Sequence, residues 1–143
     1  MTRPIVVALT VCVLLAPNGP AAAHHSFSAE FDASKPVTLH GTITKLEWIN
    51  PHSWLHVDVK NDDGTTTEWM VEAATPNTLL RRGFTRDTVK AGTEITVVGY
   101  QAKSGAHRAN GRDLILADGS RLFMGSADTG APGDPAKSEP AEH

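Results

Sequence analysis

Two alternating segments on either side of a tight turn constrain the fold of this chain most. Residues 61–64 (NDDG) carry the signature of a hairpin turn, and both flanking segments have a period of two. This pattern is typical of antiparallel strands with one buried face. The buried face of residues 54–60 carries Leu55, Val57 and Val59, and that of residues 66–73 carries Trp69, Val71 and Ala73.

Matching these two apolar faces across the turn fixes a register, because a slip of one residue would turn every side chain to the other face. The register pairs Val57 with Trp69 and Leu55 with Val71. The other face would then carry three further pairs: Trp54 with Glu72, His56 with Met70, and Asp58 with Glu68. For Trp54, outward orientation and core burial after a register slip stand as equal alternatives.

The segments before and after this hairpin predict one long strand and one short helix. Residues 37–49 are a long β-prone run, in which Gly41 can provide a bend. Residues 76–83 (PNTLLRRG) begin with proline and end with glycine, which is typical of a short helix. We expect Leu79 and Leu80 to pack inward from this helix.

The second half of the chain continues the β pattern. Residues 94–103 predict a strand, residues 104–111 a polar loop, and residues 113–117 and 121–124 a last hairpin. The order is therefore three strands, a helix, and two or three strands. This order predicts an all-β fold with one short helix, a small five- to six-stranded barrel of the oligonucleotide/oligosaccharide-binding (OB) type. An open meander sandwich is the alternative.

The first 23 residues predict a cleaved signal peptide. Arg3 precedes an uncharged, mostly apolar run of twelve residues (5–16), which is too short for a membrane-spanning helix. Ala21 and Ala23 then fit the small-residue pattern of a cleavage site, and an uncleaved anchor is the alternative. We expect cleavage after Ala23, a periplasmic or secreted protein, and no membrane span thereafter. Because the one cysteine, Cys12, lies in this leader, the mature chain would contain no disulfide.

Two flanking segments are expected to lie outside the barrel domain, which we place at residues 37–124. Residues 24–36 form an irregular N-terminal arm, with Phe27 and Phe31 as its anchors. Residues 125–143 are rich in proline, glycine, alanine and charge, and contain no large apolar residue. Such a segment cannot bury enough surface to offset its ordering entropy, so we expect a disordered tail.

Histidines are the candidate metal ligands. Cleavage after Ala23 would give His24 a free α-amine, which could chelate a metal together with imidazoles of His24 and His25. Nitrogen ligands of this kind favour copper first. His52 and His56, the latter beside Met70, could supply further ligands. A turn histidine, a surface histidine and a cross-strand packing pair are the alternative interpretations.

Charge and motifs exclude some classes of function. The formal net charge of −3 argues against binding to nucleic acid, which needs concentrated positive charge. The chain has no motif of the nucleophile-elbow, metalloprotease, P-loop or dinucleotide-binding kinds, so we expect no enzyme. The second hypothesis is a binding module for an envelope glycan, peptide or protein partner, or for a small ligand. Its platform would be the outer face of the central hairpin, with Trp54, Met70 and Glu72.

Several short motifs resemble those of a known exported bacterial family, domain of unknown function 6152. They are HHSF at 24–27, EFD at 30–32, KPV at 35–37, GTITK at 41–45, EW at 47–48, NPH at 50–52, PNTL at 76–79 and RGF at 82–84. The resemblance covers roughly residues 24–124. It implies export and a small β-domain, and it implies no catalytic or binding residues.

Overall fold

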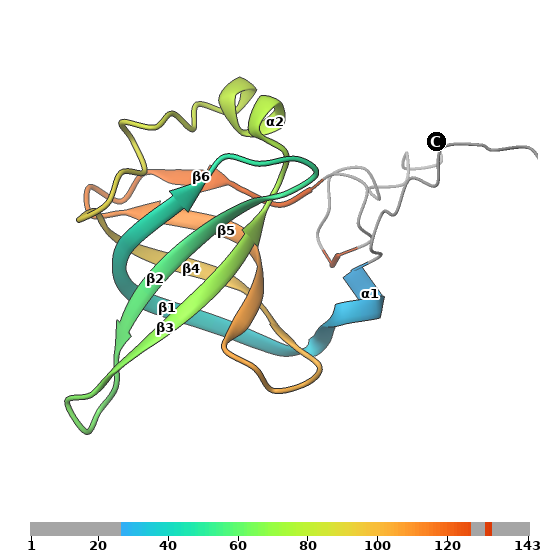
Figure 1. The fold of residues 1–143 in the computed structure, drawn as a ribbon, viewed down its shortest axis with the longest axis vertical. Helices are drawn as coiled ribbons and strands as arrows, with labels where there is room; N and C mark the ends of the chain where they lie inside the picture. The colour runs from blue at the N-terminus through green and yellow to red at the C-terminus, as the bar shows by residue number, and fades with distance from the viewer. Residues whose placement is uncertain (1–26, 127–130, 133–143) are drawn as a thin grey trace, which may run out of the picture.

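Six strands and two short helices make up the computed structural model, which describes residues 27–126 and 131–132 (Figure 1). The helices are α1 (Phe27–Glu30) and α2 (Pro76–Arg81). The strands are β1 (Phe31–Glu47), β2 (Ser53–Lys60), β3 (Thr66–Ala73), β4 (Glu94–Ala102), β5 (Arg108–Leu116) and β6 (Arg121–Phe123).

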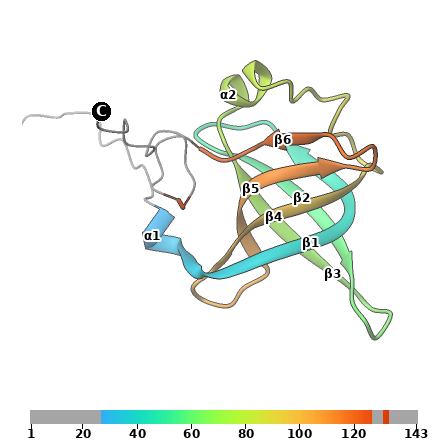
Figure 2. The same ribbon diagram turned by 180° about the vertical axis from the view of Figure 1, so that it is seen from behind.

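The strands form one sheet that closes on itself. Their order is β3-β2-β1-β4-β5-β6. The first five strands in this order form a ring, because β3 and β5, at its two ends, also pair with each other in parallel. The other neighbours pair antiparallel, and β6 is added to β5. Figures 1 and 2 show the resulting ring from opposite sides, with α2 over one end. The predicted small all-β fold, with α2 between the third and fourth strands, is confirmed.

The predicted register of the central hairpin is also confirmed. Val57 pairs with Trp69 and Leu55 with Val71, and the three outer pairs are as expected. Leu55, Val57 and Val71 are fully buried. Trp69 is half-buried and packs against the edge of the same core.

Strand β1 pairs with a neighbour on each side at Gly41, where the sequence predicts a bend, and its register with β2 shifts between Ile43 and Lys45. Gly41 lies opposite Val59 of β2 and Ile95 of β4. A Cβ atom at this position would lie 2.3 Å from the Asp58 carbonyl oxygen. Only glycine therefore allows β2 to approach β1 so closely.

The N-terminal arm differs from the prediction of an irregular segment. Residues 27–30 form α1, and β1 begins at Phe31, six residues earlier than expected. The reason is a second, small apolar cluster, in which Phe27 and Phe31 pack against Tyr100 and Ala102. These contacts hold residues 31–36 beside the end of β4.

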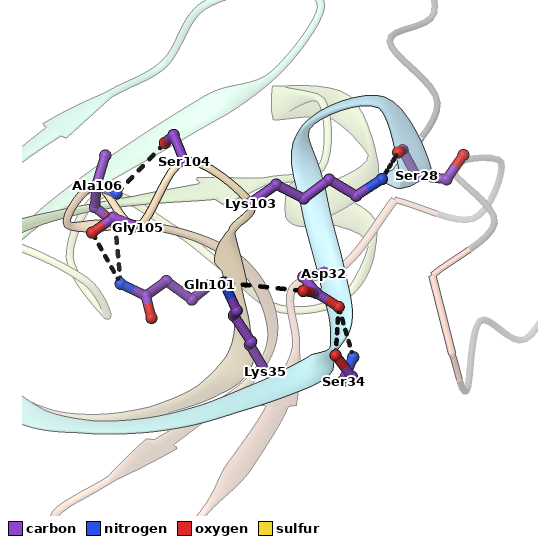
Figure 3. A network of polar contacts seen from close by, with 9 residues as sticks. All are labelled: Ser28, Asp32, Ser34, Lys35, Gln101, Lys103, Ser104, Gly105 and Ala106. Carbon is purple, nitrogen blue, oxygen red and sulfur yellow. Dashed lines mark hydrogen bonds and ion pairs between the residues drawn. The ribbon is translucent and has the colours of Figure 1, made fainter.

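Polar contacts fasten the same arm to the loop after β4 (Figure 3). Lys103 donates a hydrogen bond from Nζ to the Ser28 carbonyl oxygen over 2.6 Å, and its backbone N–H donates to the Glu30 carbonyl. Asp32 accepts hydrogen bonds from the backbone and hydroxyl of Ser34. These bonds hold the pKa of Asp32 below its ordinary value.

Helix α2 begins at Pro76, as the sequence predicts, and Thr75 caps it. The Thr78 backbone N–H donates to the Thr75 hydroxyl, which satisfies one of the unpaired donors at the helix start. Leu79 is fully buried, but Leu80 is 53% exposed. The expectation that both leucines pack inward was wrong, because consecutive helical residues point about 100° apart and this short helix covers the core with one side only.

Strand β5 begins at Arg108, inside the segment predicted to be a loop. Its first residues are held from both sides. Ala109 pairs with Gln101 of β4 and with Val71 of β3. Ala109, Asn110 and Gly111 are consequently buried. The prediction failed because this strand forms through backbone pairing, and its sequence has no apolar alternation to reveal it.

The main core fills the ring and continues under α2. It consists of Leu39, Ile43, Leu55, Val57, Val71, Ala73, Ala74, Leu79, Phe84, Val89, Ile95, Val97, Ala109, Leu114 and Met124. The predicted signal peptide (residues 1–23), His24 and His25 lie outside the described residues. So does the predicted disordered tail, except for residues 125, 126, 131 and 132.

Candidate functional site

A buried carboxylate, Glu72, is the centre of a polar cluster at one end of the ring. By strand alternation Glu72 faces away from the core, yet only 5% of it is exposed. Asn110 of β5, 3% exposed, lies opposite Glu72 in the parallel pairing. His52, in the turn before β2, places its Nδ1 atom 3.1 Å from Oε1 of Glu72. The cluster therefore forms where β2 starts, β3 ends and β5 starts.

The surroundings of Glu72 favour its protonated form. The pKa of Glu72 is raised to about 7, mainly by burial and in addition by the negative charge of Glu30, while the positive charge of Arg108 opposes the shift. The 3.1 Å contact between Nδ1 of His52 and Oε1 of Glu72 is within hydrogen-bond distance.

Arg108 ties the N-terminal arm to this cluster. Its Nη1 atom lies 2.8 Å from Oε1 of Glu30, at the end of α1. Its guanidinium lies over the Trp54 ring, 4.8 Å from the ring centroid. Both contacts are typical of arginine, whose planar group can pair with a carboxylate and stack on an aromatic face. Arg108 thus joins α1, β2 and β5 beside Glu72.

The expected ligand platform is only partly open. Trp54, Met70 and Glu72 share the outer face as predicted, but Glu72 is buried and the other two are half-buried. The reason is the approach of the chain before β5, where the Met70 backbone N–H donates to the His107 carbonyl oxygen over 3.0 Å. Sequence reasoning missed Arg108 and Asn110, because it assigned both to a loop.

His52 is not arranged as a proton relay to a nucleophile. The Ser126 hydroxyl oxygen lies 3.4 Å from Nδ1 of His52, the same nitrogen that faces Glu72. In a serine–histidine–acid triad the hydroxyl and the carboxylate contact different ring nitrogens. This trio of side chains therefore lacks the geometry of that mechanism.

His56 belongs to a separate set of contacts. Its Nε2 atom lies 3.2 Å from Glu47 of β1, and its Nδ1 atom lies 3.2 Å from Glu68 of β3. A hydrogen bond from Lys45 is the main cause that lowers the pKa of Glu47, and the contact with His56 adds to it. His52 and His56 therefore face different carboxylates. Within residues 27–126 and 131–132, no three or more histidine, cysteine or acidic side chains are grouped to hold a metal ion.

Comparison with known proteins gives a family and no activity. A model of a family of unknown function, DUF6152, matches residues 11–111. Searches of curated proteins and of solved structures give no match. In the described part of the chain, neither helix has the length and apolar character of a membrane span. Because the family model covers well over half of the sequence, this chain belongs to the DUF6152 family of unknown function.

Proposed function

We propose that this protein is an exported binding module, rather than an enzyme, and that it binds a copper ion through its mature N-terminus. Cleavage after Ala23 would give His24 a free α-amine beside two imidazoles. An amine and imidazoles are nitrogen ligands, which favour copper(II) among the common divalent ions. The compartment of action would be the periplasm or the medium.

The observation that carries this proposal is the attachment of α1 next to the His52–Glu72 pair. Glu30 of α1 contacts Arg108 at 2.8 Å, and the charges of both residues act on Glu72. His25 precedes Phe27, the first residue of α1, by two residues. Two residues of extended chain span at most about 7 Å, so we infer that the histidine pair would reach the end of the ring that carries His52.

The contact of His52 with Glu72 supports a role for His52 as a further copper ligand. Ligating histidines usually contact a carboxylate through one ring nitrogen and bind the metal through the other. Here Glu72 contacts Nδ1, so in our proposal Nε2 of His52 would coordinate the copper ion. His56 contacts a carboxylate with each of its ring nitrogens, so we do not assign it to the copper site.

The test compares two forms of the protein by calorimetric titration with copper(II). One form begins at His24, and the other carries one additional residue before it. We expect clearly weaker binding by the extended form, because its first histidine has lost the free amine. Equal affinities of the two forms would exclude the amine as a ligand.

A pair of histidine variants tests the role of His52. We expect His52→Ala to weaken copper binding, whereas His107→Ala, at an exposed histidine before β5, should leave it unchanged. Equal effects of the two variants would refute the assignment of His52. Export is tested separately by the mass of the protein recovered from the periplasm, and a mass that includes residues 1–23 would refute cleavage after Ala23.

A further inference from the structure

An open groove of about 640 Å³ lies at the opposite ends of β2, β3 and β5 from the Glu72 cluster. All five strands of the ring contribute to it. Its lining consists of His40, Gly41, Thr42, Asp58, Lys60, Thr66, Glu94, Ile95, Thr96, Ile115, Leu116 and Ala117. Its volume is within the range of about 300–1,000 Å³ that is usual for small-molecule sites.

Hydroxyl groups and carboxylates alternate across this groove. Thr42 of β1 lies directly opposite Asp58 of β2 on one side and Glu94 of β4 on the other. Residues directly opposite in antiparallel strands share a face, so a hydroxyl stands between two carboxylates. In a neighbouring pair, His40 and Thr96 are joined by a hydrogen bond of 2.8 Å between Nδ1 and Oγ1.

These groups suit a ligand whose polar atoms both donate and accept hydrogen bonds. Carboxylates only accept, whereas threonine hydroxyls do both, so together they can satisfy the hydroxyl groups of a ligand. Ile95, Ile115 and Leu116 add apolar surface to the same groove. The lining contains two carboxylates and one ammonium group, from Lys60, and this balance disfavours anionic ligands.

We propose that the groove binds a neutral saccharide. Its hydroxyl groups would bind Asp58, Glu94 and the threonine hydroxyls, and its apolar C–H face would lie against Ile115. This site shares no residue with the proposed copper site, so either proposal can fail without the other.

The experiment is a titration of the isotopically labelled protein, beginning at His24, followed through its backbone amide resonances. The probes are maltotriose and the trimer of N-acetylglucosamine, which are neutral, and the trimer of galacturonic acid, which is anionic. We expect at least one neutral sugar to shift the amides of Thr42, Thr96 and Ile115, and the acid to bind more weakly. A titration to about 10 mM would detect even a millimolar Kd.

Three outcomes would overturn the proposal. They are the absence of shifts with both neutral sugars, shifts that centre on other parts of the ring, and tighter binding of the anionic trimer. If the groove is the site, Thr42→Val and Thr96→Val should each weaken sugar binding about 3- to 10-fold, because each substitution removes one hydroxyl group and leaves the size of the side chain nearly unchanged.

The matched control is Thr38→Val. Thr38 is exposed on the same strand as Thr42, β1, but lies outside the groove. The Thr38→Val variant should therefore bind the sugar with the affinity of the unsubstituted protein. Asp58→Asn provides a further variant that retains size and removes the charge. Equal affinities in all four variants would contradict binding in this groove.

Discussion

Replacing Glu72 by glutamine should abolish a specific pH dependence of stability. Glutamine has nearly the size of glutamate and can still form a hydrogen bond with His52, but it does not ionise. In the unsubstituted protein the buried carboxyl group must lose its proton as the pH rises, and the resulting charge is costly at a site that is 5% exposed. Glu72→Gln should therefore be more stable than the parent at alkaline pH.

The magnitude follows from the two pKa values of Glu72. The carboxyl has an ordinary pKa of 4.5 in the unfolded chain and about 7 in the folded protein. Between these values the folded state binds more protons, so the free energy of unfolding falls as the pH rises, and it levels off above pH 7. The total loss is about 3 kcal/mol, of which about 2 to 3 kcal/mol falls between pH 5 and pH 8.

The assay is urea unfolding of both proteins at several pH values from 5 to 8. We expect the stability advantage of Glu72→Gln to grow by about 2 to 3 kcal/mol over this range. Asp62→Asn, at the exposed tip of the β2–β3 hairpin, is the control and should show no such trend. A constant difference between Glu72→Gln and the parent at all pH values would refute the reasoning.

Three further perturbations test the packing. Arg108→Ala should uncover Trp54 and increase the quenching of tryptophan fluorescence by acrylamide, and unchanged quenching would show that the cation–π contact protects nothing. Gly99→Ala would place a Cβ atom 2.2 Å from the Asn110 carbonyl oxygen, so we expect a loss of about 2 kcal/mol or more in urea unfolding, and a parental midpoint would contradict this close approach. Leu55→Ala should cost about 2 to 5 kcal/mol, because Leu55 is fully buried, whereas Leu80→Ala at an exposed position should cost about 0.5 kcal/mol or less. Similar thermal midpoints for the two leucine variants would be inconsistent with the described core.

The central hairpin could be predicted to the residue because two independent signals agree there. The NDDG sequence sets the length of the turn, and the alternation of Leu55 and Val57 against Trp69 and Val71 sets the face. Either signal alone would leave room for a slip of the register. The start of α2 was predictable because Pro76 marks it, and the structure adds a cap by Thr75 at the same position.

The burial of Glu72 could not be predicted from its own strand. Alternation places Glu72 outside the core correctly, but the chain that covers it comes from the start of β5, which is far away in the sequence. One signal was available. Gly99 and Gly111 are isolated glycines in or near predicted strands, and they lie opposite each other where β4 and β5 approach closely. Glycines of this kind could have indicated that β5 begins within the segment predicted to be a loop.

Of the candidate ligands, the sequence placed His52 in the turn and His56 on the strand opposite Met70 correctly, but it gave neither histidine its carboxylate partner. The carboxylate partner of His52 comes from β3, and those of His56 come from β1 and β3. Such contacts depend on side-chain direction in three dimensions, which a pattern along the chain does not contain. The copper role of His24 and His25 stays a prediction.

The parallel joint between β3 and β5 has a kinetic consequence. It comprises three residue pairs, from Met70 opposite Arg108 to Glu72 opposite Asn110, whereas β1 and β4 pair along most of their length. A short ladder of backbone hydrogen bonds separates at low free-energy cost. Transient separation of β3 from β5 should therefore be far more frequent than unfolding of the whole molecule. Each such separation would expose the carboxyl group of Glu72 to solvent. The rate at which this group exchanges its proton with water would then report how often the ring opens.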